Sequence, residues 1–382
     1  MNLFYLSFRQ LSNKPLATFL CVLLLSLGVS MMSLLLIFRQ DLEQKFEKNI
    51  EPVDLVIGSK GSPLQLILSA VYQIDSPTGN ISWETAQEIR KNKWLKNVVF
   101  LAYGDNYQSF PIVGTSTDYA KMYAAKLQTG RFWEKKFEIT LGYKVAKKLN
   151  LTLHQEFFGT HGQDGQNHEE HPYKVVGILD KTNTVLDQLI LTSMESIWES
   201  HEQNDHKEIT AILARFANPM ARLMLAAQIN SQTNLQLALP ALEVNRLFEL
   251  LGVGVEALQI LAFFLALVAG LAIFITLYNL LKERRFELAL MRSLGASRLK
   301  IYFFVIFEGL FLGILGFIFG LFLSRLGIFF LNFLVADYHY DWQYAWINDE
   351  FWIGIFCIIL GILAAFFPAW QASRTDIAKI LR

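Results

Sequence analysis

Long apolar stretches alternate with polar segments along this chain. Four stretches are long enough to cross a bilayer as helices, which takes roughly 20 residues. They are Leu16–Phe38, Ala257–Leu281, Ile301–Ser324 and Phe351–Ser373. Three of them carry no charged residue, and the stretch before the last carries only Glu308. The pattern predicts an α-helical membrane protein with four transmembrane helices.

The polar segment 39–256, between the first two stretches, has a mixed pattern that predicts an α+β domain. Strand-like runs, rich in β-branched and aromatic residues, are Val53–Ile57, Val98–Tyr103, Gln108–Val113, Glu138–Leu141, Tyr173–Ile178, Gln188–Leu191 and Glu208–Phe216. Helix-like runs are Ser82–Asn92, Thr117–Ala125, Tyr143–Leu149, Met194–Ser200 and Pro219–Asn230. The flanks Arg39–Asn49 and Pro240–Glu256 are expected to form a helical stalk, and residues 54–80 read only as loop with a short helix.

Positive charge predicts the orientation, because short cytoplasmic segments are enriched in Lys and Arg. Residues 1–15, 282–300 and 374–382 hold two, six and three Lys or Arg residues, whereas residues 325–350 hold one, Arg325. The three basic segments are therefore expected in the cytoplasm, and segments 39–256 and 325–350 outside. The first span reads as an uncleaved anchor, preceded by an interfacial helix within residues 1–15.

The basic segment 282–300 also predicts a short surface helix. Phe286, Ala289, Leu290 and Leu294 share one side at helical spacing, with Arg285 and Arg292 away from it. Gly295 is a natural stop, and Ser297 suits the cap of the next helix. Such a helix, tied to spans on both sides, could act as a lever; the alternative is an ordinary cytoplasmic loop.

The run Arg285-x-Glu287-Leu288-Ala289-Leu290-x-Arg292-x-Leu294-Gly295-Ala296-Ser297 resembles the signature loop of the FtsX-like permease family, the MacB-type (type VII) ABC transporter subunits. In that family the loop carries the coupling helix that docks on the ATPase. The resemblance implies that this role falls on Arg285, Phe286, Glu287, Leu290, Arg292, Leu294 and Gly295.

The resemblance extends over the rest of the chain. Gly130-Arg131-Phe132, Leu141-Gly142-x-x-Val145-Ala146-x-x-Leu149 and Tyr173-x-Val175-Val176-Gly177-Ile178-Leu179 follow the order of MacB-type periplasmic core domains. The chain departs from the family at His154-Gln155-Glu156, where a Gly-Asp pair is usual, and at Ile377, where a proline is usual.

The resemblance implies a permease subunit that couples ATP hydrolysis to a periplasmic movement, for export or extraction of a lipoprotein, peptide or similar cargo. The alternatives are a regulator of a periplasmic cell-wall hydrolase and a zinc-linked permease. Expected partners are an ABC ATPase, a second permease copy or paralogue, and a periplasmic or outer-membrane protein. The expected location is the bacterial cytoplasmic membrane, and zero net charge argues against a nucleic-acid partner.

Catalytic motifs are missing from the sequence: it has no GxxxxGK[ST] phosphate loop, no GxSxG and no HExxH. We therefore expect no enzyme activity in this chain, with ATP and magnesium bound by the partner subunit. A histidine-rich segment offers His161, His168 and His171, with Glu169 and Glu170, as zinc ligands; the alternative is a solvated loop.

Glycines at helical spacing mark the third span. Gly309, Gly313, Gly316 and Gly320 form one stripe that allows close helix packing; the alternative is the general glycine content of membrane helices. Glu308, beside the stripe, is expected to pair, snorkel or stay protonated in a structural role. Cys21 and Cys357 are expected in opposite halves of the bilayer, too far apart for a disulfide.

Overall fold

The computed structural model describes residues 15–161, 166–167, 171–200, 207–334 and 346–374. The expected helix within residues 1–15 thus lies almost wholly outside the described residues. The chain divides into two compact units. The bundle unit comprises Met1–Leu42 and Leu251–Arg382, and the sheet unit comprises Glu43–Leu250.

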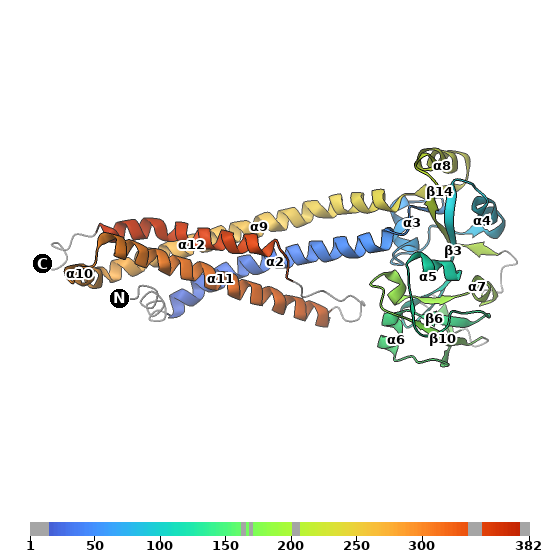
Figure 1. Cartoon of the computed structure of the whole chain (residues 1–382), viewed down its shortest axis with the longest axis horizontal. Helices are drawn as coiled ribbons and strands as arrows, with labels where there is room; N and C mark the ends of the chain where they lie inside the picture. The colour runs from blue at the N-terminus through green and yellow to red at the C-terminus, as the bar shows by residue number, and fades with distance from the viewer. Residues whose placement is uncertain (1–14, 162–165, 168–170, 201–206, 335–345, 375–382) are drawn as a thin grey trace. The chain divides into compact units, whose positions relative to one another are not determined.

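The bundle unit is formed mainly by four long helices, and each is long and apolar enough to span a membrane. They are α2 (Pro15–Ile50), α9 (Pro240–Glu283), α11 (Arg298–Leu334) and α12 (Glu350–Ser373). A short helix, α10 (Arg285–Ser293), joins α9 to α11 at one end of the bundle (Figure 1). The four long helices share one apolar core, centred on residues such as Leu25, Ile273, Leu312 and Leu360. The four predicted spans are confirmed.

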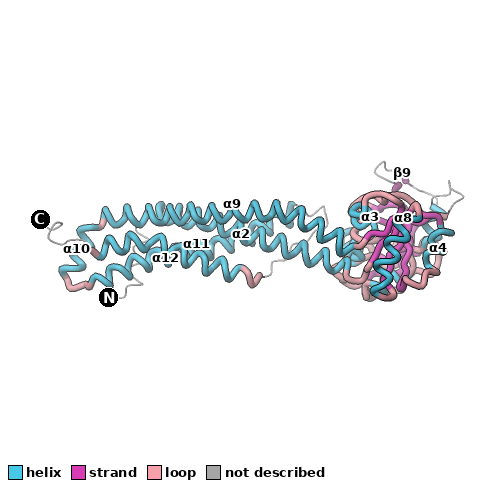
Figure 2. The backbone as a smooth tube through the Cα atoms, turned by 90° about the horizontal axis from the view of Figure 1, so that it is seen from above, coloured by secondary structure: helices cyan, strands magenta, loops and turns pink. Residues whose placement is uncertain are grey.

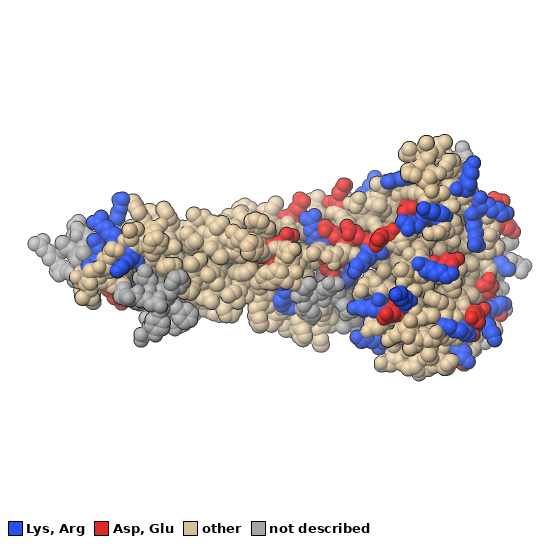
Figure 3. Space-filling model, in the orientation of Figure 1, with Lys and Arg blue, Asp and Glu red and all other residues tan. Residues whose placement is uncertain are grey.

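The surface of the bundle is apolar along most of its length. Figure 3 shows Lys and Arg gathered at the end that carries α10, followed by a band without charged side chains on this face. Many large apolar residues on these helices are exposed, among them Phe264, Leu271, Phe322 and Leu363. Exposure of an apolar surface of this extent to water is unfavourable, so the band is suited to contact with lipid.

The third span is longer than the sequence predicts, because α11 continues beyond Ser324 to Leu334. The expected outer loop 325–350 therefore begins as helix. Residues 326–334 are almost entirely apolar, so the helix continues past the single charge of Arg325, whose guanidinium pairs with both carboxylate oxygens of Glu350 at 2.8 and 2.7 Å. The hydroxyl of Ser33 on α2 donates a hydrogen bond to the same carboxylate, and its oxygen lies 3.0 Å from the hydroxyl of Ser324. These charge-assisted hydrogen bonds join α2, α11 and α12.

The glycine stripe of α11 packs within the chain. A Cβ on Gly309 would lie 2.4 Å from the carbonyl oxygen of Gly361, and one on Gly313 would lie 2.6 Å from that of Cys357, both in α12. The other two glycines face α2: a Cβ on Gly316 would meet Leu25 at 2.5 Å. The stripe thus brings α11 against two neighbours, so its contacts are accounted for without a second copy of the chain.

The two cysteines are free, as the sequence predicts. Cys21 lies near one end of its span, where its sulfur is 3.1 Å from the hydroxyl of Thr276. Cys357 is buried against Gly313.

A mixed sheet forms the centre of the sheet unit (Figure 2). Its main strand order is β14-β1-β13-β3-β4-β11-β6-β10-β5. The bounds are β1 (Leu55–Ser59), β3 (Leu95–Tyr107), β4 (Phe110–Gly114), β5 (Leu127–Gly130), β6 (Glu138–Leu141), β10 (Tyr173–Leu179), β11 (Ile190–Thr192), β13 (Ala211–Phe216) and β14 (Leu235–Ala238). The short strands β7 (Glu156–Phe157), β8 (Thr160–His161) and β9 (Gln166–Asn167) attach at its side, and β2 (Ile81–Ser82) pairs with β12 (Glu208–Ile209). β6 and β10 are parallel, as are β4 and β11, and the other pairs are antiparallel.

Successive residues along a strand point to opposite faces of the sheet, and each face has its own cover. Val56, Val113 and Leu191 face a core that is covered by α3 (Pro63–Ala70), α5 (Thr117–Met122) and the 3-10 turn Val185–Gln188. Their neighbours Ile57, Ile112 and Ile190 face the other side. There the cover is α4 (Trp83–Arg90) and α8 (Pro219–Gln232) over one half of the sheet, with α6 (Tyr143–Leu149) and α7 (Met194–Ser200) over the other.

Several of the predicted strands differ in the structure. Glu208–Phe216 is split at Thr210, whose amide and hydroxyl both donate to the carbonyl of Leu101 at 2.8 and 2.9 Å. The first part pairs with β2 and the second with β3. Gln188, expected in a strand, lies in the 3-10 turn before β11. The short helix expected within residues 54–80 is α3, which starts at Pro63 after the capping residue Ser62.

Close backbone contacts explain the glycines in the motifs of this unit. Gly130 of β5 pairs with Gly177 of β10. A Cβ on Gly177 would lie 2.1 Å from the carbonyl oxygen of Arg131, and one on Gly130 would lie 2.2 Å from that of Val176. Gly130 also has φ +80°, which side chains with a Cβ rarely adopt. Only glycine fits at this crossing of the two strands.

The ends of α2 and α9 that belong to the sheet unit are fixed to its core. Asn49, in the last turn of α2, accepts a hydrogen bond from the amide of Val185 at 2.6 Å. The hydroxyls of Tyr72 and Tyr123 donate to the carbonyls of Phe46 and Asn49 at 3.0 and 2.9 Å. Phe248 of α9 packs edge-on against Phe46. Burial raises the pKa of Tyr72 and of Tyr123 well above the usual range, so both phenols keep their protons for these bonds.

Candidate functional site

Helix α10 is a separate short helix between two membrane helices. Arg284 alone stands between it and α9, and its backbone leaves the helical region at φ −98°, ψ 13°. At the other end, the amide of Gly295 bonds to the carbonyl of Arg292, and that of Ala296 to Met291, both at 3.0 Å. This is a Schellman motif with Gly295 at φ +94°. The predicted stop at Gly295 is confirmed.

The next helix begins directly after this turn. Ser297 precedes α11, and its hydroxyl accepts a hydrogen bond from the amide of Lys300 at 3.3 Å, as predicted for a capping serine. Only Leu294 to Ser297 therefore separate α10 from α11. The connection is short on both sides.

The two faces of α10 differ sharply in exposure. Leu288 is 4% exposed and packs with Ile301 and Phe304 of α11 and Ala372 of α12. Phe286, Leu290 and Leu294 are 60%, 47% and 81% exposed. They follow one another at intervals of four residues, so they lie along one outward side of the helix.

One residue was assigned to the wrong face by the sequence pattern. The spacing predicts Ala289 on the same side as Phe286 and Leu290, but it is only 1% exposed. It follows Leu288 directly, and the helix turns these two neighbours together toward the bundle. Helical spacing alone does not show whether a small residue such as Ala289 belongs to the outward face or to the buried face.

A buried ion pair lies where α9 gives way to α10. The guanidinium of Arg284 is 3.4 Å from the carboxylate of Glu308 on α11, and both side chains are largely buried. Of the three alternatives expected for Glu308, the structure shows pairing. The sequence pattern does not single out Arg284, although a lone carboxylate in an apolar span indicates that a cation must approach it.

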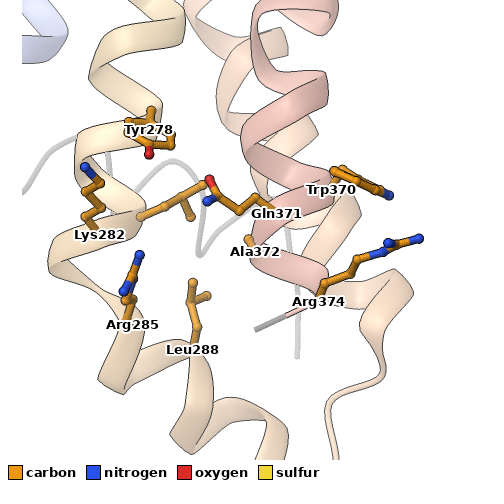
Figure 4. Close-up of a pocket in the computed structure, with 9 residues that line it drawn as sticks. Tyr278, Lys282, Arg285, Leu288, Trp370, Gln371, Ala372 and Arg374 are labelled. Atoms are coloured by element: carbon orange, nitrogen blue, oxygen red, sulfur yellow. The ribbon is translucent and has the colours of Figure 1, made fainter. Parts of the chain in front are cut away.

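Arg285 follows Arg284 but faces another feature, a cavity of about 280 Å³ beside α10. Figure 4 shows the side chain of Arg285 directed toward Lys282 and Tyr278 of α9. Trp370, Gln371 and Ala372 of α12, with Arg374 directly after the helix, line the opposite wall. Figure 4 shows Gln371 directed toward α9, and the side chains of Trp370 and Arg374 directed away from it.

The expected zinc ligands lie mostly outside the described residues: His168, Glu169 and Glu170 are not described, and only the backbone of His161 is. His171 is described, and its ring stacks on Phe137 with centroids 4.7 Å apart. No group of three or more metal-binding side chains occurs among the residues that the structure describes. At the departure from the family pattern, His154 adopts φ +71°, a conformation that glycine takes more easily.

Comparison with known proteins places both units in established families. The model of the MacB-like periplasmic core domain matches residues 18–233, which is more than half of the chain. The model of the FtsX-like permease C-terminal region matches residues 259–377. An uncharacterised ABC transporter permease of Methanocaldococcus jannaschii is 22% identical over 360 residues, covering 89% of this chain and 78% of the relative.

Two solved structures resemble part of the chain. The periplasmic region of MacB from Actinobacillus actinomycetemcomitans covers 54% of this chain and 98% of its own, with 12% identity and a TM-score of 0.39. The extracellular domain of the noncanonic ABC-type transporter YknZ from Gram-positive bacteria covers 48% and 98%, with 14% identity and a TM-score of 0.33. On the sequence matches, this chain belongs to the FtsX-like permeases with a MacB-like periplasmic core domain, and it is an ABC transporter permease of the MacB/FtsX type.

Proposed function

We propose that α10 is the element through which a separate ATPase subunit drives this permease. The single observation that carries the proposal is the outward row of Phe286, Leu290 and Leu294 on a helix whose other face is buried. Large apolar side chains exposed outside the membrane band are suited to an apolar groove on a partner, as in helix-in-groove recognition. Glu287 and Arg292 would make charged contacts at the rim of that groove, together with Arg285 at the start of the helix.

The position of α10 in the chain agrees with a cytoplasmic partner. The periplasmic core domain follows the first span, and the second span returns across the membrane before α10 begins. An ATPase that uses cytoplasmic ATP would meet α10 on that side. The chain itself has no phosphate loop, so the ATPase would have to be another subunit.

A force on α10 would pass into the membrane helices because little chain is free to absorb it. Leu288 holds α10 against α11 and α12, and the Arg284–Glu308 pair holds its beginning against α11. The connection through Gly295 is a hydrogen-bonded turn rather than a flexible linker. Displacement of α10 should therefore displace the ends of α9 and α11.

Transmission to the periplasmic domain would use α2 and α9. Each is one continuous helix from the bundle unit into the sheet unit. Asn49, Tyr72 and Tyr123 fix the end of α2 to the core of that unit. We therefore infer mechanotransmission, in which the permease does work on a lipoprotein, peptide or similar cargo in the periplasm, with a second permease copy or paralogue completing the assembly. Control of a cell-wall hydrolase would use the same transmission with a different periplasmic partner.

The test is purification of the tagged full chain from native membranes in mild detergent. Mass spectrometry should find an ABC ATPase, recognised by its own phosphate loop, and the complex should hydrolyse ATP. Addition of ATP should change hydrogen exchange in residues 43–50 and 240–250. The proposal fails if no ATPase accompanies the chain, or if ATP leaves exchange in these segments unchanged.

A further inference from the structure

The cavity beside α10 contains basic residues, Lys282 and Arg374, that the docking role does not use. Its walls come from α9, α10 and α12, and its charged lining residues are Lys282, Arg285 and Arg374. None of the described residues that line it is acidic. Figure 4 shows the side chain of Arg285 directed toward Lys282, whereas that of Arg374 is directed away from both; the two neighbouring cations repel one another unless an anion lies between them.

Two of the cations are oriented by aromatic rings rather than neutralised. The ammonium of Lys282 lies 4.6 Å from the ring centre of Tyr278, and the guanidinium of Arg374 lies 4.3 Å from that of Trp370. Such contacts hold a cation in place but leave its full charge available. Among the described residues, no ion pair involves Lys282, Arg285 or Arg374.

The position of the cavity indicates which anion it takes. It lies where the apolar parts of α9 and α12 end, and Tyr278 and Trp370 are the residue types found at the level of lipid headgroups. Lipid phosphates occupy the same level, and basic pockets between membrane helices bind anionic headgroups. Leu281 and Leu288 complete the lining with apolar surface, which suits a lipid better than a free ion.

We propose that this cavity binds the phosphate of an anionic phospholipid from the membrane leaflet beside α10. Lys282 and Arg285 contact the phosphate, and the apolar lining contacts the glycerol region. Binding itself does not depend on the proposed function. If α10 is also the docking helix, the lipid joins it to α9 and α12, so the composition of the leaflet would regulate how far α10 moves.

The experiment uses the full chain without an ATPase, in detergent, with phosphatidylglycerol as the probe and phosphatidylcholine as the uncharged comparison. Native mass spectrometry measures how much of each lipid stays bound. The variant Lys282→Gln/Arg285→Gln removes two positive charges from the cavity. The matched control Arg298→Gln/Lys300→Gln removes two from exposed positions at the start of α11, outside the cavity lining.

We expect the native chain to retain phosphatidylglycerol over phosphatidylcholine, the cavity variant to bind it at least roughly tenfold more weakly, and the control to bind as the native chain does. Equal loss in both variants would reduce the effect to general surface charge and overturn the proposal. No preference between the lipids, or no loss in the cavity variant, would overturn it as well. A third arm adds inorganic phosphate: displacement of the lipid by millimolar phosphate would show an anion site without lipid character, against the proposal. Unchanged thermal unfolding of both variants confirms that they are folded.

Discussion

The guanidinium of Arg284 lies 3.4 Å from the carboxylate of Glu308, and the two side chains are largely buried at the junction of α9, α10 and α11. A carboxylate in an apolar span is costly unless it is paired. The pair therefore stabilises the position at which a force on α10 would enter the bundle, and it can be tested directly.

Replacing Arg284 alone should destabilise the bundle. Arg284→Met leaves the Glu308 carboxylate without its partner, and breaking a buried pair from one side costs about 3–5 kcal/mol. Thermal unfolding of the full chain in detergent measures the loss. The double variant Arg284→Met/Glu308→Leu should recover most of the stability, since it removes both charges. Equal stability of the native chain and Arg284→Met would show that the pair contributes nothing.

The glycines of α11 should differ in their tolerance of a single methyl group. Gly309→Ala places a Cβ 2.4 Å from the carbonyl of Gly361, so the helices must separate, at a cost of about 1–3 kcal/mol. Gly327→Ala is the control, because its Cβ would lie at an ordinary 3.4 Å from Leu34. The unfolding temperature in detergent should fall only for Gly309→Ala. A similar fall for both variants would mean that helix propensity or general packing, rather than this close contact, causes the loss of stability.

The anchor of α2 on the sheet unit should depend on Asn49. Asn49→Ala removes the acceptor of the Val185 amide, and a buried amide without an acceptor costs about 1–3 kcal/mol. Hydrogen exchange of the peptide that contains Val185, measured in the full chain, should accelerate. The exposed Asn234→Ala is the matched control and should leave this exchange unchanged. Protection retained in Asn49→Ala would contradict the anchor.

The pair formed by Arg131 and Glu138 should give part of the stability a pH dependence. The Arg131 guanidinium holds both carboxylate oxygens at 2.8 and 2.7 Å and, with the amides of Glu134 and Lys135, lowers the pKa of Glu138 to about 2. A lowered folded pKa contributes stability above the unfolded value, near 4.3, which is lost as the pH falls toward 2. Between pH 5 and pH 2 the native chain should therefore lose more thermal stability than Glu138→Gln, which cannot titrate there. Parallel curves for the two proteins would refute this contribution.

Much of the fold was predictable because the deciding interactions are local or periodic. The four spans follow from apolar length, Gly295 and Ser297 from the backbone demands of a helix end, and the strands from alternation. Spacing did not reveal interactions between distant residues. The Arg325–Glu350 pair accommodates a charge within the long apolar helix α11, and Thr210 divides a strand by bonding to Leu101.

The candidate site was predicted in part for the same reason. The row Phe286, Leu290 and Leu294 is visible as a helical repeat, whereas the buried side of α10 depends on what α11 and α12 present to it. Ala289 and Leu288 could be assigned only once Ile301, Phe304 and Ala372 were in place. The cavity beside α10 joins residues about 90 positions apart, so no local pattern indicates it.

The most direct test of the central claim is the association of an ATPase with Phe286→Ala/Leu290→Ala. The control, Phe329→Ala/Leu331→Ala, removes the same two side-chain types from exposed positions near the other end of α11. Both variants are purified from native membranes, and the ATPase that remains bound is quantified with its ATP hydrolysis. We expect the α10 variant to lose the ATPase while keeping the unfolding temperature of the native chain, and the control to retain it. Full retention of the ATPase and of ATP-dependent exchange changes in the α10 variant would contradict the claim that α10 is the docking element.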